Sequence, residues 1–74
     1  MASTSLIRRL NSLPFVQNIH EDNLGIIIEC KGDVILMDSL MALENVLRTE
    51  SYGIYSINTT VLRKIVIYVL KGGV

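Results

Sequence analysis

Hydrophobic residues recur at helical spacing near the start of the chain. Leucines fall at i, i+4 and i+7 from Leu6, and arginine, asparagine and serine fill the opposite side. This pattern predicts an amphipathic helix over about residues 4–13. Any of the residues 3–5 offers a hydroxyl that can cap its first turn, and Pro14 ends it.

A second helix is predicted over about residues 39–49. Leu40, Leu43 and Leu47 repeat the same spacing, and polar residues occupy the other side. Asp38 or Ser39 precedes this pattern and is a good N-cap residue. Each predicted helix is followed by segments whose pattern is typical of β-strands.

Alternating or continuous apolar residues with β-branched side chains predict four strands. Two sets of turn-forming residues join these strands into two hairpins, Glu21–Asn23 in the first and Asn58–Thr60 in the second. Val34–Met37 is either a short additional strand or an extended lead-in to the second helix, and the last four residues are expected to be a frayed tail. The four predicted strands are residues 15–20, 24–30, 52–58 and 62–70.

The two halves of the chain resemble each other. Residues 5–13 match residues 39–47 at four of nine positions, and each helix precedes a predicted hairpin. We therefore expect one domain, residues 1–74, made of two αββ halves over about 4–30 and 38–70. The predicted fold class is α+β in the order α-β-β-(β)-α-β-β, with both helices on one face of a four- or five-stranded antiparallel sheet.

The helical and strand patterns together predict a hydrophobic core. It draws on the apolar side of each helix and on one face of the sheet. Its expected members are Leu6, Leu10, Leu13, Phe15, Ile26, Ile28, Leu40, Leu43, Leu47, Ile57, Ile65 and Ile67.

The segment from Ile65 to Leu70 is apolar on both faces, as in a strand that is covered on both sides. Two short helices can cover only one face of the sheet. The other face would leave Val66, Tyr68 and Leu70 in water unless a second copy covers them. We therefore expect a homodimer formed largely by the C-terminal hairpin, either by edge pairing or by stacking of two sheets.

Composition and charge also indicate that part of the surface is covered by another chain. Half of the residues are hydrophobic, and 27 of these 37 are Ile, Leu or Val, which excludes intrinsic disorder. Seven basic and seven acidic residues cancel, with an acidic centre, net −5 over residues 21–50, between basic ends. A neutral chain this apolar is poorly soluble as a monomer, so part of its surface is expected to be covered by itself or by a protein partner.

The expected location is the cytoplasm. The longest apolar run is six residues, far below the roughly 20 of a membrane span. The serines and arginines of the first ten residues superficially resemble a transit peptide, but they also fit the outer side of the first helix. The single cysteine, Cys30, excludes an internal disulfide.

Candidate chemistry is sparse. His20, Glu21, Asp22 and Asn23 offer metal-type ligands, but consecutive residues on a turn do not converge on one ion. Cys30 is interpreted as a small buried hydrophobe, and the single glycines Gly25, Gly32 and Gly53 make no phosphate-binding loop. We expect no metal, no cofactor and no catalytic site.

The leading functional prediction is a small non-enzymatic protein-interaction or regulatory protein that binds a protein partner as a homo-oligomer. Small, motif-free, apolar proteins are common among phage and mobile-element products that block a host protein, although no residue carries that interpretation. The alternative is a small nucleic-acid-binding regulator that stacks bases on its tyrosines. Its basic face would consist of Arg8, Arg9, Arg63 and Lys64.

Overall fold

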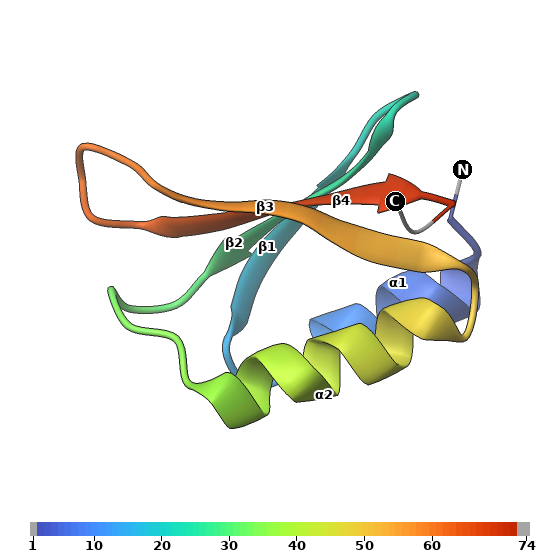
Figure 1. Ribbon diagram of the computed structural model, residues 1–74, viewed down its shortest axis with the longest axis horizontal. Helices are drawn as coiled ribbons and strands as arrows, with labels where there is room; N and C mark the ends of the chain where they lie inside the picture. Colours follow the sequence, from blue (N-terminus) through green and yellow to red (C-terminus); the bar gives the residue numbers. More distant parts are fainter. Residues whose placement is uncertain (1, 73–74) are drawn as a thin grey trace.

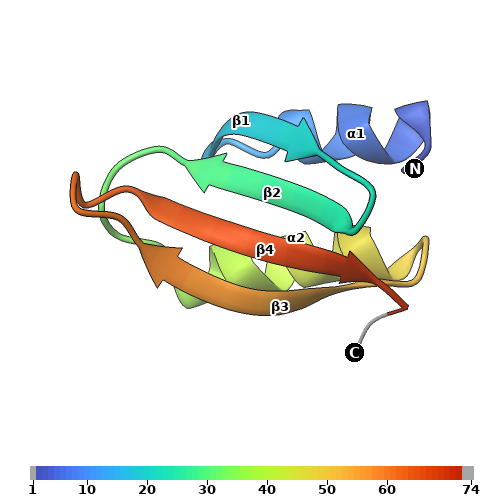
Figure 2. The same ribbon diagram turned by 90° about the horizontal axis from the view of Figure 1, so that it is seen from above.

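The computed structural model describes residues 2–72, which form two helices and a four-stranded antiparallel sheet (Figures 1 and 2). Both helices lie on one face of the sheet (Figure 1). The predicted fold class is confirmed, with four strands. In chain order the elements are α1 (Thr4–Asn11), β1 (Val16–Glu21), β2 (Gly25–Cys30), α2 (Met37–Arg48), β3 (Tyr52–Thr59) and β4 (Ile65–Lys71).

The sheet reflects the two halves seen in the sequence. Its strand order is β1-β2-β4-β3, and every neighbouring pair is antiparallel. The second strand of each half lies in the centre, and the first strand of each half forms an edge. Exchanging the halves leaves this order unchanged, as expected for an αββ unit that occurs twice.

The first helix ends close to its predicted bounds. The Ser3 hydroxyl oxygen accepts a hydrogen bond from the backbone N–H of Leu6 at 3.0 Å, so Ser3 is the N-cap. The C-cap is Ser12, whose hydroxyl donates to the carbonyl of Arg9 at 2.7 Å. Leu6 and Leu10 are fully buried under the sheet, whereas Leu13 lies beyond the helix and is half-buried.

The second helix begins two residues earlier than predicted. Its N-cap is Leu36, which has extended backbone angles and makes no side-chain capping bond. The prediction that Asp38 or Ser39 caps the helix is therefore wrong, although Asp38 in the first turn still complements the helix dipole. Residues 34–36 pair with no strand among residues 2–72, and Leu36 has extended backbone angles, so this segment is a lead-in to the helix and not a strand.

The first hairpin turn is held by one aspartate. The carboxylate of Asp22 accepts hydrogen bonds from the backbone N–H groups of Leu24 at 2.8 Å and Gly25 at 2.9 Å. This arrangement is an Asx turn. It lies one residue later than the predicted turn because Glu21 still belongs to β1.

The second hairpin turn is longer than predicted. The N–H of Thr60 donates to the carbonyl of Lys64 at 2.8 Å, and Arg63 takes a positive φ of 61°. These bonds make a turn of residues 60–64, so the prediction that the last strand starts at Leu62 is wrong. The last strand continues through Lys71, the first residue of the predicted tail, and the part of that tail at Gly73 and Val74 lies outside the described residues.

The core lies between the helices and the sheet and contains most of its predicted members. Ile57 is a wrong prediction, because its side chain is 45% exposed. The β3–β4 hairpin diverges from α2 toward its turn, so α2 does not cover this position (Figure 1). The buried cluster consists of Leu6, Leu10, Val16, Ile26, Ile28, Cys30, Leu43, Leu47, Tyr52, Ile65, Ile67 and Val69.

Candidate protein-interaction surface

The sheet has an open face that neither helix covers (Figures 1 and 2). Along β4, Ile65, Ile67 and Val69 belong to the core cluster, and the alternating residues point to the open face. These are Val66, Tyr68 and Leu70, the three predicted interface residues. Their surroundings differ because each is paired with different residues on β2 and β3.

Val66 is covered within its own chain. It pairs with Glu29 on one side and with Asn58 on the other, and only 8% of it is exposed. Cross-strand neighbours on one face of a sheet stand about 5 Å apart, so these two longer side chains flank the valine. The expectation that Val66 needs a second copy to leave water is wrong.

Leu70 and Tyr68 remain accessible. Leu70 pairs with Gly25 and Gly53 and is half-buried. Tyr68 pairs with Ile27 and Ser56 and is 39% exposed. Together with Gly25, Leu70 and Tyr68 line a hollow in the open face at this end of the hairpin.

The hollow is an apolar groove of about 370 Å³. Tyr55 from β3 and Leu24 from the first hairpin turn contribute strongly exposed side chains to it. Its complete lining is Asp22, Leu24, Gly25, Ile26, Ile27, Tyr55, Ser56, Tyr68, Val69 and Leu70. Three of the ten large exposed hydrophobic residues of residues 2–72 thus border a single groove, which we call the open-face groove.

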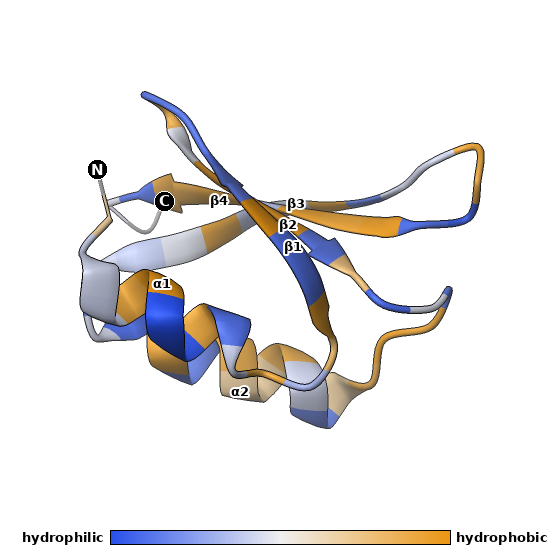
Figure 3. Cartoon of the chain, turned by 180° about the vertical axis from the view of Figure 1, so that it is seen from behind, coloured by the Kyte–Doolittle hydropathy of each residue, from blue (hydrophilic) through white to orange (hydrophobic). Residues whose placement is uncertain are grey.

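Other exposed apolar residues lie at the end of the molecule that carries the β3–β4 turn. Part of this turn and most of the segment before α2 are hydrophobic, and both lie at the same end (Figure 3). They include Val61 and Leu62 in the turn and Leu36 before the helix. Met37 and Met41 continue the exposed apolar set along α2.

The four residues of the predicted basic face are not brought together. Arg8 and Arg9 lie on α1, whereas Arg63 lies in the turn at the opposite end of the long axis (Figures 1 and 2). Arg9 pairs with Glu50, and Lys64 donates to the Gln17 side chain at 2.8 Å. None of the four borders the open-face groove.

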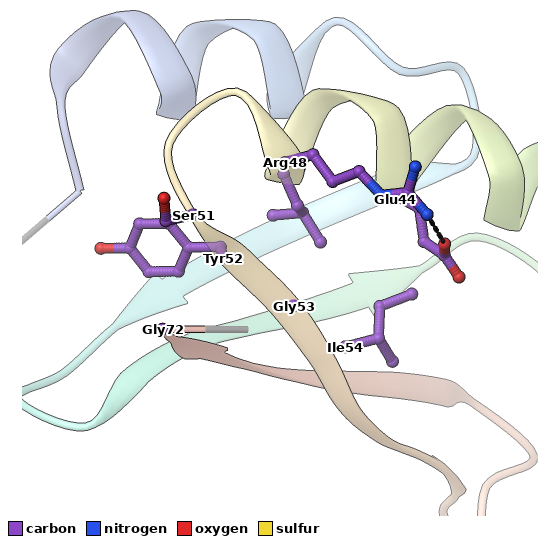
Figure 4. Close-up of a pocket in the computed structure, with 8 residues that line it drawn as sticks. Glu44, Arg48, Ser51, Tyr52, Gly53, Ile54 and Gly72 are labelled. Atoms are coloured by element: carbon purple, nitrogen blue, oxygen red, sulfur yellow. Dashed lines mark hydrogen bonds and ion pairs between the residues drawn. The ribbon is translucent and has the colours of Figure 1, made fainter. Parts of the chain in front are cut away.

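A more polar pocket lies between the end of α2 and the start of β3 (Figure 4). It measures about 480 Å³, and Glu44 and Arg48 form an ion pair of 3.4 Å at its rim. Ser51 supplies a hydroxyl, but among residues 2–72 no histidine or carboxylate is hydrogen-bonded to it to activate it. This pocket offers a polar surface for contact.

Cys30 and His20 are the remaining chemical candidates that the sequence offers. Burial raises the pKa of the Cys30 thiol above its ordinary value of 9.0, which makes the thiol less reactive at neutral pH. His20 lies on the surface, 3.5 Å from a Glu29 oxygen. Within residues 2–72, no three His, Cys, Asp or Glu side chains are close enough to hold a metal ion.

Sequence reasoning found two members of the groove and missed two others as interface residues. Tyr68 and Leu70 follow from strand alternation. Tyr55 belongs only to the tyrosines of the nucleic-acid alternative, because the sequence does not reveal the β-bulge that turns its side chain toward the groove. Leu24 looks like an ordinary first strand residue, and only the Asx turn at Asp22 places it in the exposed turn.

Neither helix of residues 2–72 is long and apolar enough to cross a membrane. Comparison of the chain with protein-family models, with curated proteins and with solved structures found no match. Any function must therefore be argued from the surface described above.

Proposed function

We propose that this chain is a small non-enzymatic protein-interaction protein that works as a homo-oligomer and binds a protein partner through the open-face groove. The observation that carries the proposal is the gathering of Leu24, Tyr55 and Tyr68 around one hollow. Exposed apolar patches with a polar border are typical of protein-binding sites.

The composition of the groove suits a protein ligand. Tyrosines give a large contact area with little loss of conformational freedom, and their hydroxyl groups can bond to a partner's backbone. Leu70 lines the groove beside Tyr68, and an apolar side chain of a partner can contact both. Hot-spot residues of interfaces are often aromatic side chains that lie in well-packed, desolvated pockets.

A second candidate is single-stranded nucleic acid, which the tyrosine pair favours. Tyr55 and Tyr68 line the same groove on a sheet face, and bases stack on such aromatic side chains. The charges favour it less, because the only charged residue in the groove lining is the acidic Asp22. A nucleic-acid site needs cations that contact phosphates.

The test compares the parent chain with Tyr68→Lys and with the control Val61→Lys, which adds the same charge at an exposed turn position outside the groove. Each is used to retain proteins from a lysate of the organism of origin. We expect a protein that the parent and the control retain and Tyr68→Lys does not. Identical retention by the parent and both variants would contradict binding through the groove.

The second candidate is tested with single-stranded RNA and DNA over a series of salt concentrations. Micromolar binding that weakens steeply with salt and is lost in the double variant Tyr55→Ala, Tyr68→Ala would favour the nucleic-acid function. We expect no such binding.

A further inference from the structure

The two edges of the sheet differ in how they are protected. β1 carries His20 and Glu21, and its side chains are engaged by neighbouring polar groups, such as the Gln17 side chain with Lys64. β3 is the other edge, has eight residues, and contains neither a charged residue nor a proline. Within residues 2–72, no segment pairs with its outer side.

Exposed sheet edges usually carry charges, prolines or bulges that prevent pairing with another chain. The only such feature of β3 is the bulge at Tyr55, where the register shifts between Ile54 and Ser56. At about 3.3 Å per residue the strand is about 26 Å long, close to the 29 Å length of the whole molecule. An edge of this length and composition is suited to pairing.

The helix that contacts β3 adds a second element to the same side. Glu44 and Arg48 line the pocket next to residues 53 and 54 of β3, so this side of α2 borders the β3 edge (Figure 4). Met41 and Met37 lie three and seven residues before Glu44, which places them on the same stripe of the helix. Both methionines are exposed, Met41 by 57%.

We propose that two copies of this chain join β3 to β3 in an antiparallel pair and pack the methionine stripes of α2 across the same interface. The product is an eight-stranded sheet with two-fold symmetry. This inference rests on the proposed homo-oligomer and names its interface. Of the two arrangements that the sequence left open, it selects edge pairing.

Charge favours a second copy as the occupant of this edge. In a two-fold symmetric interface each patch meets itself, so a strand with a charge of one sign brings like charges together. β3 has no charge, and the ion pair of Glu44 with Arg48 neutralises the charged part of the stripe. The net charge of zero removes long-range repulsion between copies.

The available area is sufficient. A stable interface needs about 800 Å² from each partner, which is about a sixth of the 4902 Å² surface of the chain. A strip that follows the longest strand and the neighbouring helix can supply this area. Pairing at β3 also brings the two open-face grooves side by side, because Tyr55 stands on the paired strand.

The test measures the dimer dissociation constant by sedimentation for the parent and for three lysine variants. Met41→Lys changes the proposed interface, Tyr68→Lys changes the open face, and Val61→Lys is the control for added charge. We expect Met41→Lys to weaken the dimer at least tenfold and the other two to change it less than threefold. Weakening by Tyr68→Lys alone would overturn edge pairing and would leave the proposed homo-oligomer intact.

Hydrogen exchange gives a second measurement that does not depend on a variant's folding. Pairing at the edge protects backbone N–H groups of β3, whereas stacking of two open faces leaves them exchanging. We expect exchange in residues 52–59 of the parent chain to slow as the concentration rises through the dissociation constant, while β1 does not change. A parent chain of 8.3 kDa at tens of micromolar would overturn the inference, and the groove would then be tested separately by the retention experiment.

Discussion

Arg9 and Glu50 lie 41 positions apart in the sequence, and their side chains meet with an Nη2–Oε2 distance of 3.4 Å. The contact ties α1 to the turn after α2. Arg9 also donates to the Thr49 hydroxyl at 2.9 Å, and the same Glu50 oxygen accepts from the Ser3 hydroxyl at 2.5 Å. Glu50 thus joins the N-cap and the last turn of α1 to the turn that follows α2.

The Arg9–Glu50 pair predicts a measurable coupling between the two helices. Arg9→Gln, Glu50→Gln and the double variant should give a coupling free energy of about 0.2–1 kcal/mol at low salt, because the pair is only partly exposed. Glu50→Gln should cost more than Arg9→Gln, because it also weakens the bond from Ser3. The measurement is urea unfolding of all four proteins at low and at high salt.

The matched control is the pair of Glu44 with Arg48, which has the same 3.4 Å separation within one helix and is more exposed. Its coupling should be about 0.3–0.5 kcal/mol. A zero coupling for Arg9 with Glu50 in low salt would show that the contact does not join the helices in solution.

Leu43 is the clearest single test of α2. It is fully buried in the core cluster, so Leu43→Ala should cost about 2–5 kcal/mol. A chain of this length holds only about 4–11 kcal/mol in total, so the variant should be unfolded or nearly so in thermal melts. Leu62→Ala makes the same chemical change at an exposed turn position and should stay within about 0.5 kcal/mol of the parent. A Leu43→Ala melting point within a few degrees of the parent would contradict the packing of α2.

Gly25 is required by a close approach of two strands. A Cβ atom at this position would stand 2.0 Å from the carbonyl oxygen of Val69, which is backbone and cannot rotate away. Gly25→Ala should therefore separate β2 from β4 and cost at least the roughly 1–3 kcal/mol typical of overpacking. Urea unfolding measures this cost.

Gly32→Ala separates steric clash from backbone strain. Gly32 has a φ of +74° and open space around its Cα, so alanine there should cost only the roughly 1–2 kcal/mol of left-handed strain. Gly32→Asn should recover part of this loss, because asparagine tolerates this conformation. A smaller loss for Gly25→Ala than for Gly32→Ala would contradict the close approach of the strands.

The helices and the strand count were predictable because the apolar pattern reports burial directly. Leu6, Leu10, Leu43 and Leu47 repeat at helical spacing and are all fully buried. The wrong predictions concern the turns and the ends of helices and strands, whose positions depend on short-range hydrogen bonds. In the turn before β4, Arg63 adopts a left-handed backbone conformation. Arginine rarely takes this conformation, so the sequence does not predict it.

The groove was only half predictable, because it depends on what stands beside each residue across the sheet. Val66 and Leu70 look equivalent in the sequence, but register places Glu29 and Asn58 beside the first and two glycines beside the second. Register is set by the turns, and both turns differ from the predicted ones. The sequence therefore predicts which face is apolar and not which part of it is open.

Two buried ionisable groups predict a loss of stability at alkaline pH. Burial raises the pKa of the Cys30 thiol above 9.0, and burial together with the carboxylates of Glu21 and Glu50 raises the pKa of Tyr52 above 10.0. In each case the unfolded chain loses its proton at lower pH than the folded chain does. Ionisation therefore favours unfolding, and the free energy of unfolding should be constant near neutrality and fall as the pH rises above about 9.

Cys30→Ala separates the two contributions to this alkaline loss. With the thiol removed, the decline should begin only near pH 10, where Tyr52 starts to ionise in the unfolded chain. The variant lowers stability at pH 7, because it removes a buried side chain, so the shape of the pH profile is compared and not its height. The same burial should make Cys30 in the folded parent react slowly with a thiol reagent at pH 7 and rapidly in denaturant. Fast reaction in the folded state, or a stability that rises between pH 8 and 10, would show that the strand carrying Cys30 is not packed against the helices as described.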